Sequence, residues 1–130
     1  MKIANTLSVI LGTVLLLLAL QWIFIPASAA ESLGMAYLDG EGRNTQIRDF
    51  TAFFLATSIM CYLSFATKKY EYIFVCGLVY ILAATFNILA SINHEAPLAL
   101  SSLISEIVFA SMAWIASYKY KNLSVTYKII

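Results

Sequence analysis

The stretch Leu98–Tyr118, LALSSLISEIVFASMAWIASY, contains one charged side chain, that of Glu106. A helix needs about 20 mostly apolar residues to cross a bilayer, and this stretch is long enough. A charge inside such a helix is costly unless a nearby group satisfies it, so an intramembrane carboxyl group is a candidate functional residue by default. The stretch therefore predicts a transmembrane helix that carries one candidate site residue, Glu106.

Three further apolar stretches make the chain a predicted membrane protein. The 130 residues are 62% hydrophobic and 12% charged, whereas soluble domains are roughly half apolar and about a quarter charged. Single strands are excluded, because their backbone groups would lack partners in hydrocarbon. We predict an all-α fold, one domain that forms an antiparallel bundle of four transmembrane helices. Its expected helices cover about residues 7–25, 49–66, 71–92 and 98–118, with an outer loop at 27–47.

The first stretch also has features of a cleaved signal peptide. Lys2 gives a positive start, and Ala27-Ser28-Ala29 is typical of a cleavage site. However, the apolar run exceeds the roughly 7–15 residues of a signal core. It ends in Trp22-Ile23-Phe24-Ile25-Pro26, an aromatic end typical of a membrane interface. We expect an uncleaved first helix, with Trp22 at the outer interface.

Charge distribution predicts the orientation. If the four helices alternate in direction, both arginines, Arg43 and Arg48, fall on one side, and six lysines fall on the other: Lys2, Lys68, Lys69, Lys119, Lys121 and Lys128. An excess of basic residues marks the cytoplasmic side. We therefore expect an integral protein of the inner or plasma membrane with both termini cytoplasmic. Its lysines would contact anionic lipid headgroups.

The outer loop is the one long connection in this arrangement. Its first residues predict a short interfacial helix that stops at Gly34. No metal or phosphate-binding spacing occurs in the loop, so a plain connector is favoured over a binding loop.

Polar residues of three helices and one turn are predicted to meet near the outer interface. At a rise of about 1.5 Å per residue, Glu106 lies roughly 12 Å below that interface and Asn87 roughly 8 Å below it. A short turn joins their helices, so the two side chains are expected to approach each other. Arg48 lies on the same side, and its long side chain either reaches Glu106 or pairs with Asp49. The predicted outward-facing cluster comprises Arg48, Asp49, Asn87, His94 and Glu106.

Each member of this cluster has a structural alternative. Glu106 would be a carboxyl group that only fixes helix register, and Asp49 an interface anchor. Asn87 would join helices through hydrogen bonds, as amides in membranes commonly do. His94 would be solvated in the turn. On the fourth helix, small residues share a face with Glu106 and favour close helix packing: Ser102, Ala110, Ala113 and Ser117.

Motifs for cofactors are absent from the sequence. A single histidine excludes a haem with two histidine ligands from one chain. No glycine-rich phosphate loop, nucleophile elbow or zinc signature occurs, so we expect no cofactor, no metal and no nucleic acid partner. Cys61 and Cys76 are expected to lie close together near the cytoplasmic turn. Buried, inert thiols are favoured there over a redox pair.

A run on the second helix is similar to a known family. Arg48-Asp49-Phe50-x-Ala52-Phe53-Phe54, preceded by Trp22-x-Phe24-x-Pro26 and followed by the late glutamate Glu106, resembles small bacterial four-helix membrane proteins. These are catalogued as domain of unknown function number 4345. The resemblance covers about Trp22 to Lys119 and implies the same fold, with Arg48 and Glu106 as shared residues. It implies no activity. The third helix departs from the pattern, with Ala83, Ala84 and Asn87 where many members carry glycines and an arginine.

Three functions are compatible with these features. The short, bare helices favour an accessory or structural subunit of a larger membrane complex, with other membrane subunits or a second copy as partner. The alternative is a binder or carrier of a small lipophilic molecule, a lipid or a quinone, in the outward-facing polar cavity. An intramembrane enzyme with Glu106 or His94 as acid or base has the least support, because no nucleophile or metal constellation accompanies them.

Overall fold

The computed structural model describes residues 1–129 and is all-helical, with 88% of residues in helices and no strand in the described part. Its elements are α1 (Lys2–Phe24), α2 (Pro26–Ser32), α3 (Gly40–Thr67), α4 (Tyr70–His94) and α5 (Leu100–Ile129). The four long helices are each long and apolar enough to cross a membrane. The predicted all-α class with four such helices is therefore confirmed.

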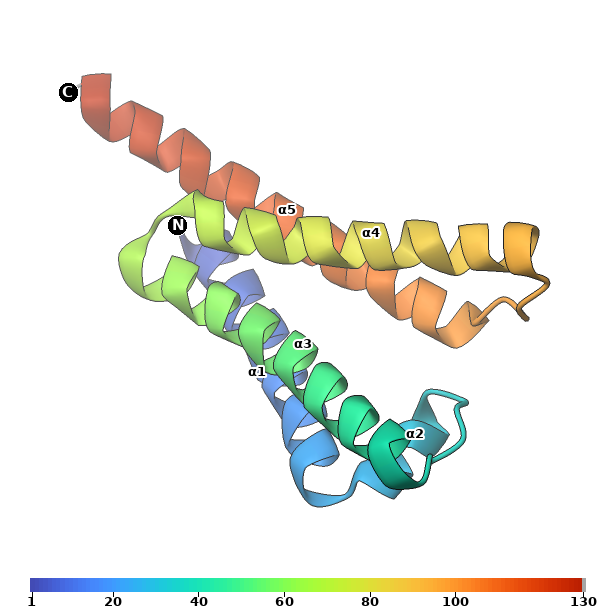
Figure 1. The fold of residues 1–130 in the computed structure, drawn as a ribbon. Helices are drawn as coiled ribbons and strands as arrows, with labels where there is room; N and C mark the ends of the chain where they lie inside the picture. Colours follow the sequence, from blue (N-terminus) through green and yellow to red (C-terminus); the bar gives the residue numbers. More distant parts are fainter. Residues whose placement is uncertain (130) are drawn as a thin grey trace.

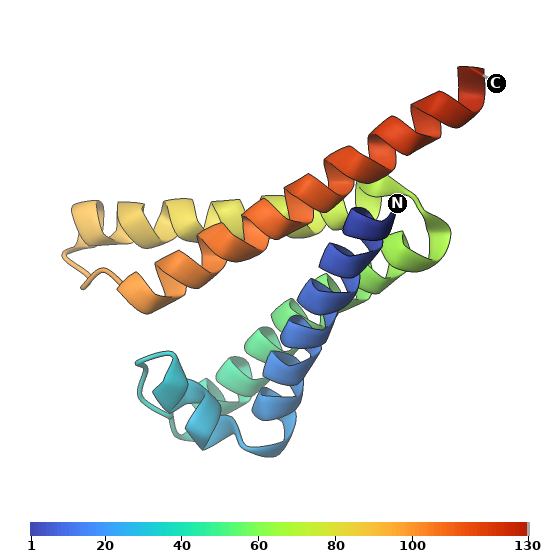
Figure 2. The same ribbon diagram turned by 180° about the vertical axis from the view of Figure 1, so that it is seen from behind.

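The long helices form two pairs. α1 lies along α3, and α4 lies along α5 (Figure 1). The pairs converge at the end that holds the N-terminus and the turn between α3 and α4, and they diverge toward α2 and the connection between α4 and α5 (Figure 2). We call the converging end the apex, around the 67–70 turn. The space between the diverging pairs, next to Phe53 and Glu106, is the wedge.

Small residues allow the close packing of the apex. Gly12 faces Cys61 and Tyr62, and a Cβ atom at Gly12 would lie 3.2 Å from either side chain. Gly77 lies under Trp114, where a Cβ atom would come within 2.3 Å of the indole ring. The small-residue face predicted for the fourth helix is buried there, at Ala110, Ala113 and Ser117. That expectation is confirmed for these three residues, on which the close approach of α5 depends, whereas Ser102 of the same face lines a cavity in the wedge.

Polar side chains at the apex form hydrogen bonds between helices. Ser58 Oγ donates to the carbonyl oxygen of Gly12 at 2.6 Å, which joins α3 to α1. The hydroxyl of Tyr120 donates to Asn5 Oδ1 at 3.0 Å and lies 3.1 Å from Ser8 Oγ. Such bonds satisfy groups that hydrocarbon would leave unpaired.

The two thiols also lie at the apex. The Sγ atoms of Cys61 and Cys76 are 3.7 Å apart, and both residues are buried and free. The expected proximity of the two cysteines is confirmed.

All four long helices are longer than the hydropathy pattern predicts, and α3 and α5 exceed it most. α3 begins at Gly40 instead of about residue 49, and α5 continues to Ile129 instead of ending near residue 118. Hydropathy marks only the apolar part of a helix. The backbone hydrogen bonds of the same helix continue into the polar sequence beyond it. Gln46 stabilises the early start, because its amide accepts from Leu38 N and donates to Ala36 O.

The outer loop is shorter than expected, because α3 begins at Gly40. It contains the short helix α2, as the sequence indicated, and Gly34 follows it with a φ of +70°. This left-handed backbone is accessible to glycine without a steric penalty.

Candidate ligand-binding cleft

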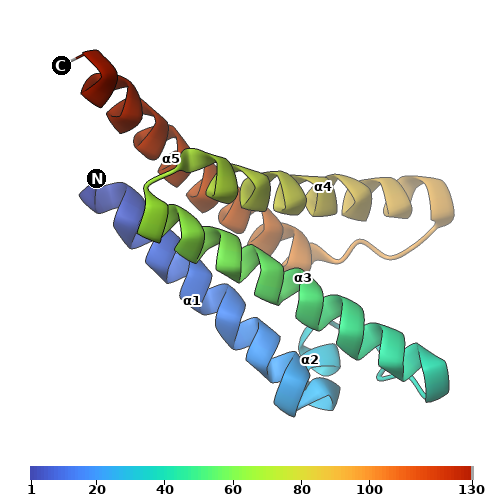
Figure 3. The same ribbon diagram turned by 60° about the vertical axis from the view of Figure 1, so that its left-hand side comes forward.

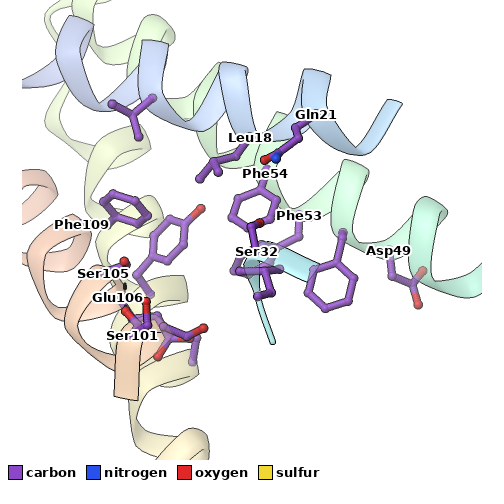
Figure 4. A pocket seen from close by; sticks show the side chains of 16 residues that line it. Leu18, Gln21, Ser32, Asp49, Phe53, Phe54, Ser101, Ser105, Glu106 and Phe109 are labelled. Atoms are coloured by element: carbon purple, nitrogen blue, oxygen red, sulfur yellow. Dashed lines mark hydrogen bonds between the residues drawn. The ribbon is translucent and has the colours of Figure 1, made fainter. Parts of the chain in front are cut away.

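A cavity of about 630 Å³ occupies the wedge. Residues of all four long helices line it, together with Ser32 of α2 and Leu33 (Figure 4). A cavity of this size is within the range of small-molecule sites in proteins, roughly 300–1,000 Å³. It exists because the buried residues of α4 end at Ala84 and those of α5 begin at Ala110, so the outer parts of α4 and α5 leave α1 and α3.

Phenylalanines of α3 form one wall of this cleft. Phe50, Phe53 and Phe54 recur at helical spacings of three and four residues and therefore share one face. Phe53 meets Phe54 edge-on with ring centroids 5.2 Å apart. Behind this wall Trp22 stacks on Phe50 at 4.8 Å and is only 1% exposed. Trp22 is therefore buried inside the α1–α3 pair near the end of α1, and its expected depth at the outer interface stays a prediction.

Aromatic rings also form the inner end of the cleft, toward the apex. Tyr80 of α4 contacts Phe53 and Phe109, with ring centroids 5.2 Å apart in each case and edge-on geometry. The hydroxyl of Tyr80 is 2.8 Å from Thr57 Oγ1, so its polar end is satisfied inside the protein. The cleft therefore ends on an apolar floor.

Glu106 lies in the α5 wall, and serines surround it. Ser102 and Phe109, four residues before and three residues after Glu106, share its helical face. Ser101 and Ser105 line the cavity beside it (Figure 4). Glu106 is half-buried, and its Oε2 atom is buried without a hydrogen-bond partner among the described residues 1–129. A buried polar atom without a partner costs about 1–3 kcal/mol. The cleft thus contains an acceptor that the protein itself leaves unsatisfied.

Asp49 lies on the opposite side of the cleft, and its charge is partnered. Arg48 Nε donates to Asp49 Oδ1 at 2.9 Å, and both side chains are about 60% exposed, 62% and 61%. Arg48 itself does not line the cavity. Of the two partners considered for Arg48, the structure supplies the neighbour on its own helix. It does not bring Arg48 to Glu106, because the wedge separates α3 from α5 at this level.

The remaining predicted site residues lie outside the cavity. The side-chain amide of Asn87 donates to Ala99 O at 3.0 Å and accepts from Ala99 N at 3.1 Å. It thereby holds the connection between α4 and α5, as the structural alternative for this residue had it. His94 is the exposed last residue of α4 and is followed by Glu95 with a φ of 55°. Of the five predicted residues, Asp49 and Glu106 line one cavity, and the side chain of Asn87 lies close to Glu106, as expected from the sequence.

Sequence reasoning missed Ser101 and Ser105 of α5 and Gln21 of α1 as lining residues. Helical spacing groups Ser102, four residues before Glu106, with that residue, but it does not group Ser105, which directly precedes Glu106. Gln21 is the strongly polar residue of the first apolar stretch, and it lines the cavity. The run that carries the family resemblance supplies four lining residues, Asp49, Phe50, Phe53 and Phe54.

In comparisons with protein-family models, curated proteins and solved structures, nothing matches this chain. The resemblance to small bacterial four-helix membrane proteins stays a prediction. The function is therefore argued from the geometry of the cleft.

Proposed function

We propose that this protein binds a small lipophilic molecule in the wedge. The observation that carries the proposal is the unpartnered Oε2 atom of Glu106 in the wall of an aromatic cavity of about 630 Å³. The aromatic rings would bury an apolar body, and Glu106 would fix one polar group. Mostly apolar walls with a few polar groups are the usual composition of small-molecule sites.

The membrane orientation follows from the lysines. We infer an antiparallel arrangement in the inner or plasma membrane with both termini cytoplasmic. Lys2, Lys68 and Lys69 lie at the apex, and Lys119 and Lys121 lie where α5 passes it. The positive-inside rule then places the apex toward the cytoplasm and the open wedge toward the outer leaflet. A lipophilic ligand would reach the cleft from that leaflet.

Retention of a molecule during purification tests the binding proposal. We expect mass spectrometry of the protein, released intact from mild detergent, to show a bound small molecule. A Ser105→Trp variant, which fills the cleft and keeps Glu106, should lose it. A Ser111→Trp variant should retain it, because Ser111 is exposed on the same helix. The same adduct on all three proteins, or no adduct on the wild type, would contradict the proposal.

A second candidate function is that of an accessory subunit, as the short chain suggests. It is favoured by the last turns of α5, which extend past the apex (Figure 3). Apolar side chains are exposed on this extension, with Val125 at 49%, Tyr127 at 76% and Ile129 at 80%. We expect a partner protein to co-purify in mild detergent and to be lost in an Ile129→Lys variant. Purification of the wild type at the mass of one chain would rule this function out.

A further inference from the structure

The ionisable side chains that line the cleft near its open end are acidic. Among its lining residues are two acids, Asp49 and Glu106, and no lysine, arginine or histidine. The nearest base in sequence, Arg48, is not a lining residue and pairs with Asp49, where both side chains are exposed. Glu106 is therefore the one carboxyl group of the cleft without a partner cation.

Aromatic faces and carboxyl groups together favour a particular ligand charge. The faces of aromatic rings carry negative potential and attract cations within about 6 Å. Phe53, Tyr80 and Phe109 border the same space as Glu106. An anion would meet both the carboxyl group and the ring faces unfavourably. A neutral molecule would supply no counter-charge to the carboxylate form of Glu106, whereas an ammonium group would stabilise that form.

We propose that the ligand of the wedge is an organic cation, a protonated amine on an apolar body. This inference rests on the proposed binding function and names its ligand class. The ammonium group donates hydrogen bonds to Glu106 Oε2, which has no other partner. The apolar body lies against the phenylalanines of α3. The hydroxyl groups of Ser102 and Ser105 offer further acceptors beside the carboxyl group.

The size of the cavity determines which small molecules are suitable probes of binding. A bicyclic aromatic body fits within 630 Å³ and matches the ring-lined walls. Two molecules then differ only in the polar group, 1-naphthylmethylamine, which is protonated at pH 7, and 1-naphthylmethanol, which is neutral. A third, 1-naphthylacetate, carries the opposite charge. Their binding separates the charge of the ligand from its shape.

The experiment measures binding by titration calorimetry to the full chain in nanodiscs of zwitterionic lipid, with empty nanodiscs as blank. We expect wild-type protein to bind the amine at least tenfold more tightly than the alcohol and not to bind the acetate. Glu106→Gln should reduce amine affinity to that of the alcohol. Asp49→Asn should keep most of the preference, because Asp49 already has Arg48 as partner.

The outcomes separate this inference from the proposed function. In one outcome, the wild type binds the amine and the alcohol equally, and Ser105→Trp binds neither. That result would support a lipophilic site in the wedge and overturn the proposal that its ligand is a cation. Tighter binding of the acetate would overturn the cation as well. Binding of none of the three probes would count against both proposals. The comparison of the amine with the alcohol in the wild type is enough to decide the charge of the ligand. The result therefore does not depend on whether the Glu106→Gln variant folds.

Discussion

The two ends of the helix pairs differ in what fills the space between them. At the apex, glycine, alanine and serine bring the helices together, and hydroxyl groups bond to partners on other helices. In the wedge, aromatic side chains face a cavity, and one carboxyl oxygen has no partner. The apex is thus closely packed and hydrogen-bonded, whereas the wedge is open and contains an unpartnered acceptor. Unsatisfied polar groups in a folded protein are commonly found where function requires them.

The largest contrast is expected from adding the same side chain to each end. Gly77→Val should destabilise the protein by about 2–3 kcal/mol, because the added atoms would overlap the indole of Trp114. Ala83→Val adds similar bulk to the wall of the cavity and should change stability by about 0.5 kcal/mol or less. Unfolding by sodium dodecyl sulfate in lipid–detergent micelles measures both. Equal losses of stability in the two variants would show that the apex and the wedge do not differ in packing.

A hydroxyl deletion at the apex should have an intermediate effect. Tyr120→Phe removes the bond to Asn5 and the contact with Ser8. Because hydrogen bonds between membrane helices contribute about 1 kcal/mol, we expect a loss of that order. Tyr118→Phe is the matched control on the same helix, because Tyr118 is 63% exposed. The same unfolding titration applies, and a loss as large in the control would show that the network does not stabilise the apex.

The fold is largely predictable from the sequence, and the shape of the wedge is not. Helix spans follow from the length of apolar segments, and Glu106 stands out because charge is costly in hydrocarbon. The burial of Ala110 and Ala113 follows from their spacing on one face. The divergence of the helix pairs depends on crossing angles, which the summed packing of many side chains determines.

The contacts within the predicted site depend on the same distances between helices. Arg48 had two possible partners, and a separation of a few ångströms between helices decides between them. Asn87 was placed at the right depth, but the backbone of Ala99 offers its amide both a donor and an acceptor. Sequence spacing groups residues on one helix more reliably than it pairs residues on two.

The wedge should tolerate loss of its carboxyl group. Glu106→Leu replaces a buried, unpartnered oxygen by an apolar side chain of similar size. We expect the free energy of unfolding of the ligand-free protein to stay unchanged or to rise by up to about 1 kcal/mol. The unfolding titration after extensive detergent exchange measures it. A loss above about 1 kcal/mol would instead support the structural role, in which Glu106 fixes helix register.

The smallest effect is expected at the rim of the wedge. The ion pair of Arg48 and Asp49 is exposed, and such pairs contribute about 0.5 kcal/mol or less. Arg48→Gln and Asp49→Asn should therefore each change stability only slightly, and a double-mutant cycle should give a coupling energy in the same range. The companion cycle of Arg48→Gln with Glu106→Gln should give no coupling, because the wedge lies between the two side chains. A coupling of about 2 kcal/mol in that second cycle would mean that the helix pairs close in the membrane and bring the guanidinium group to Glu106.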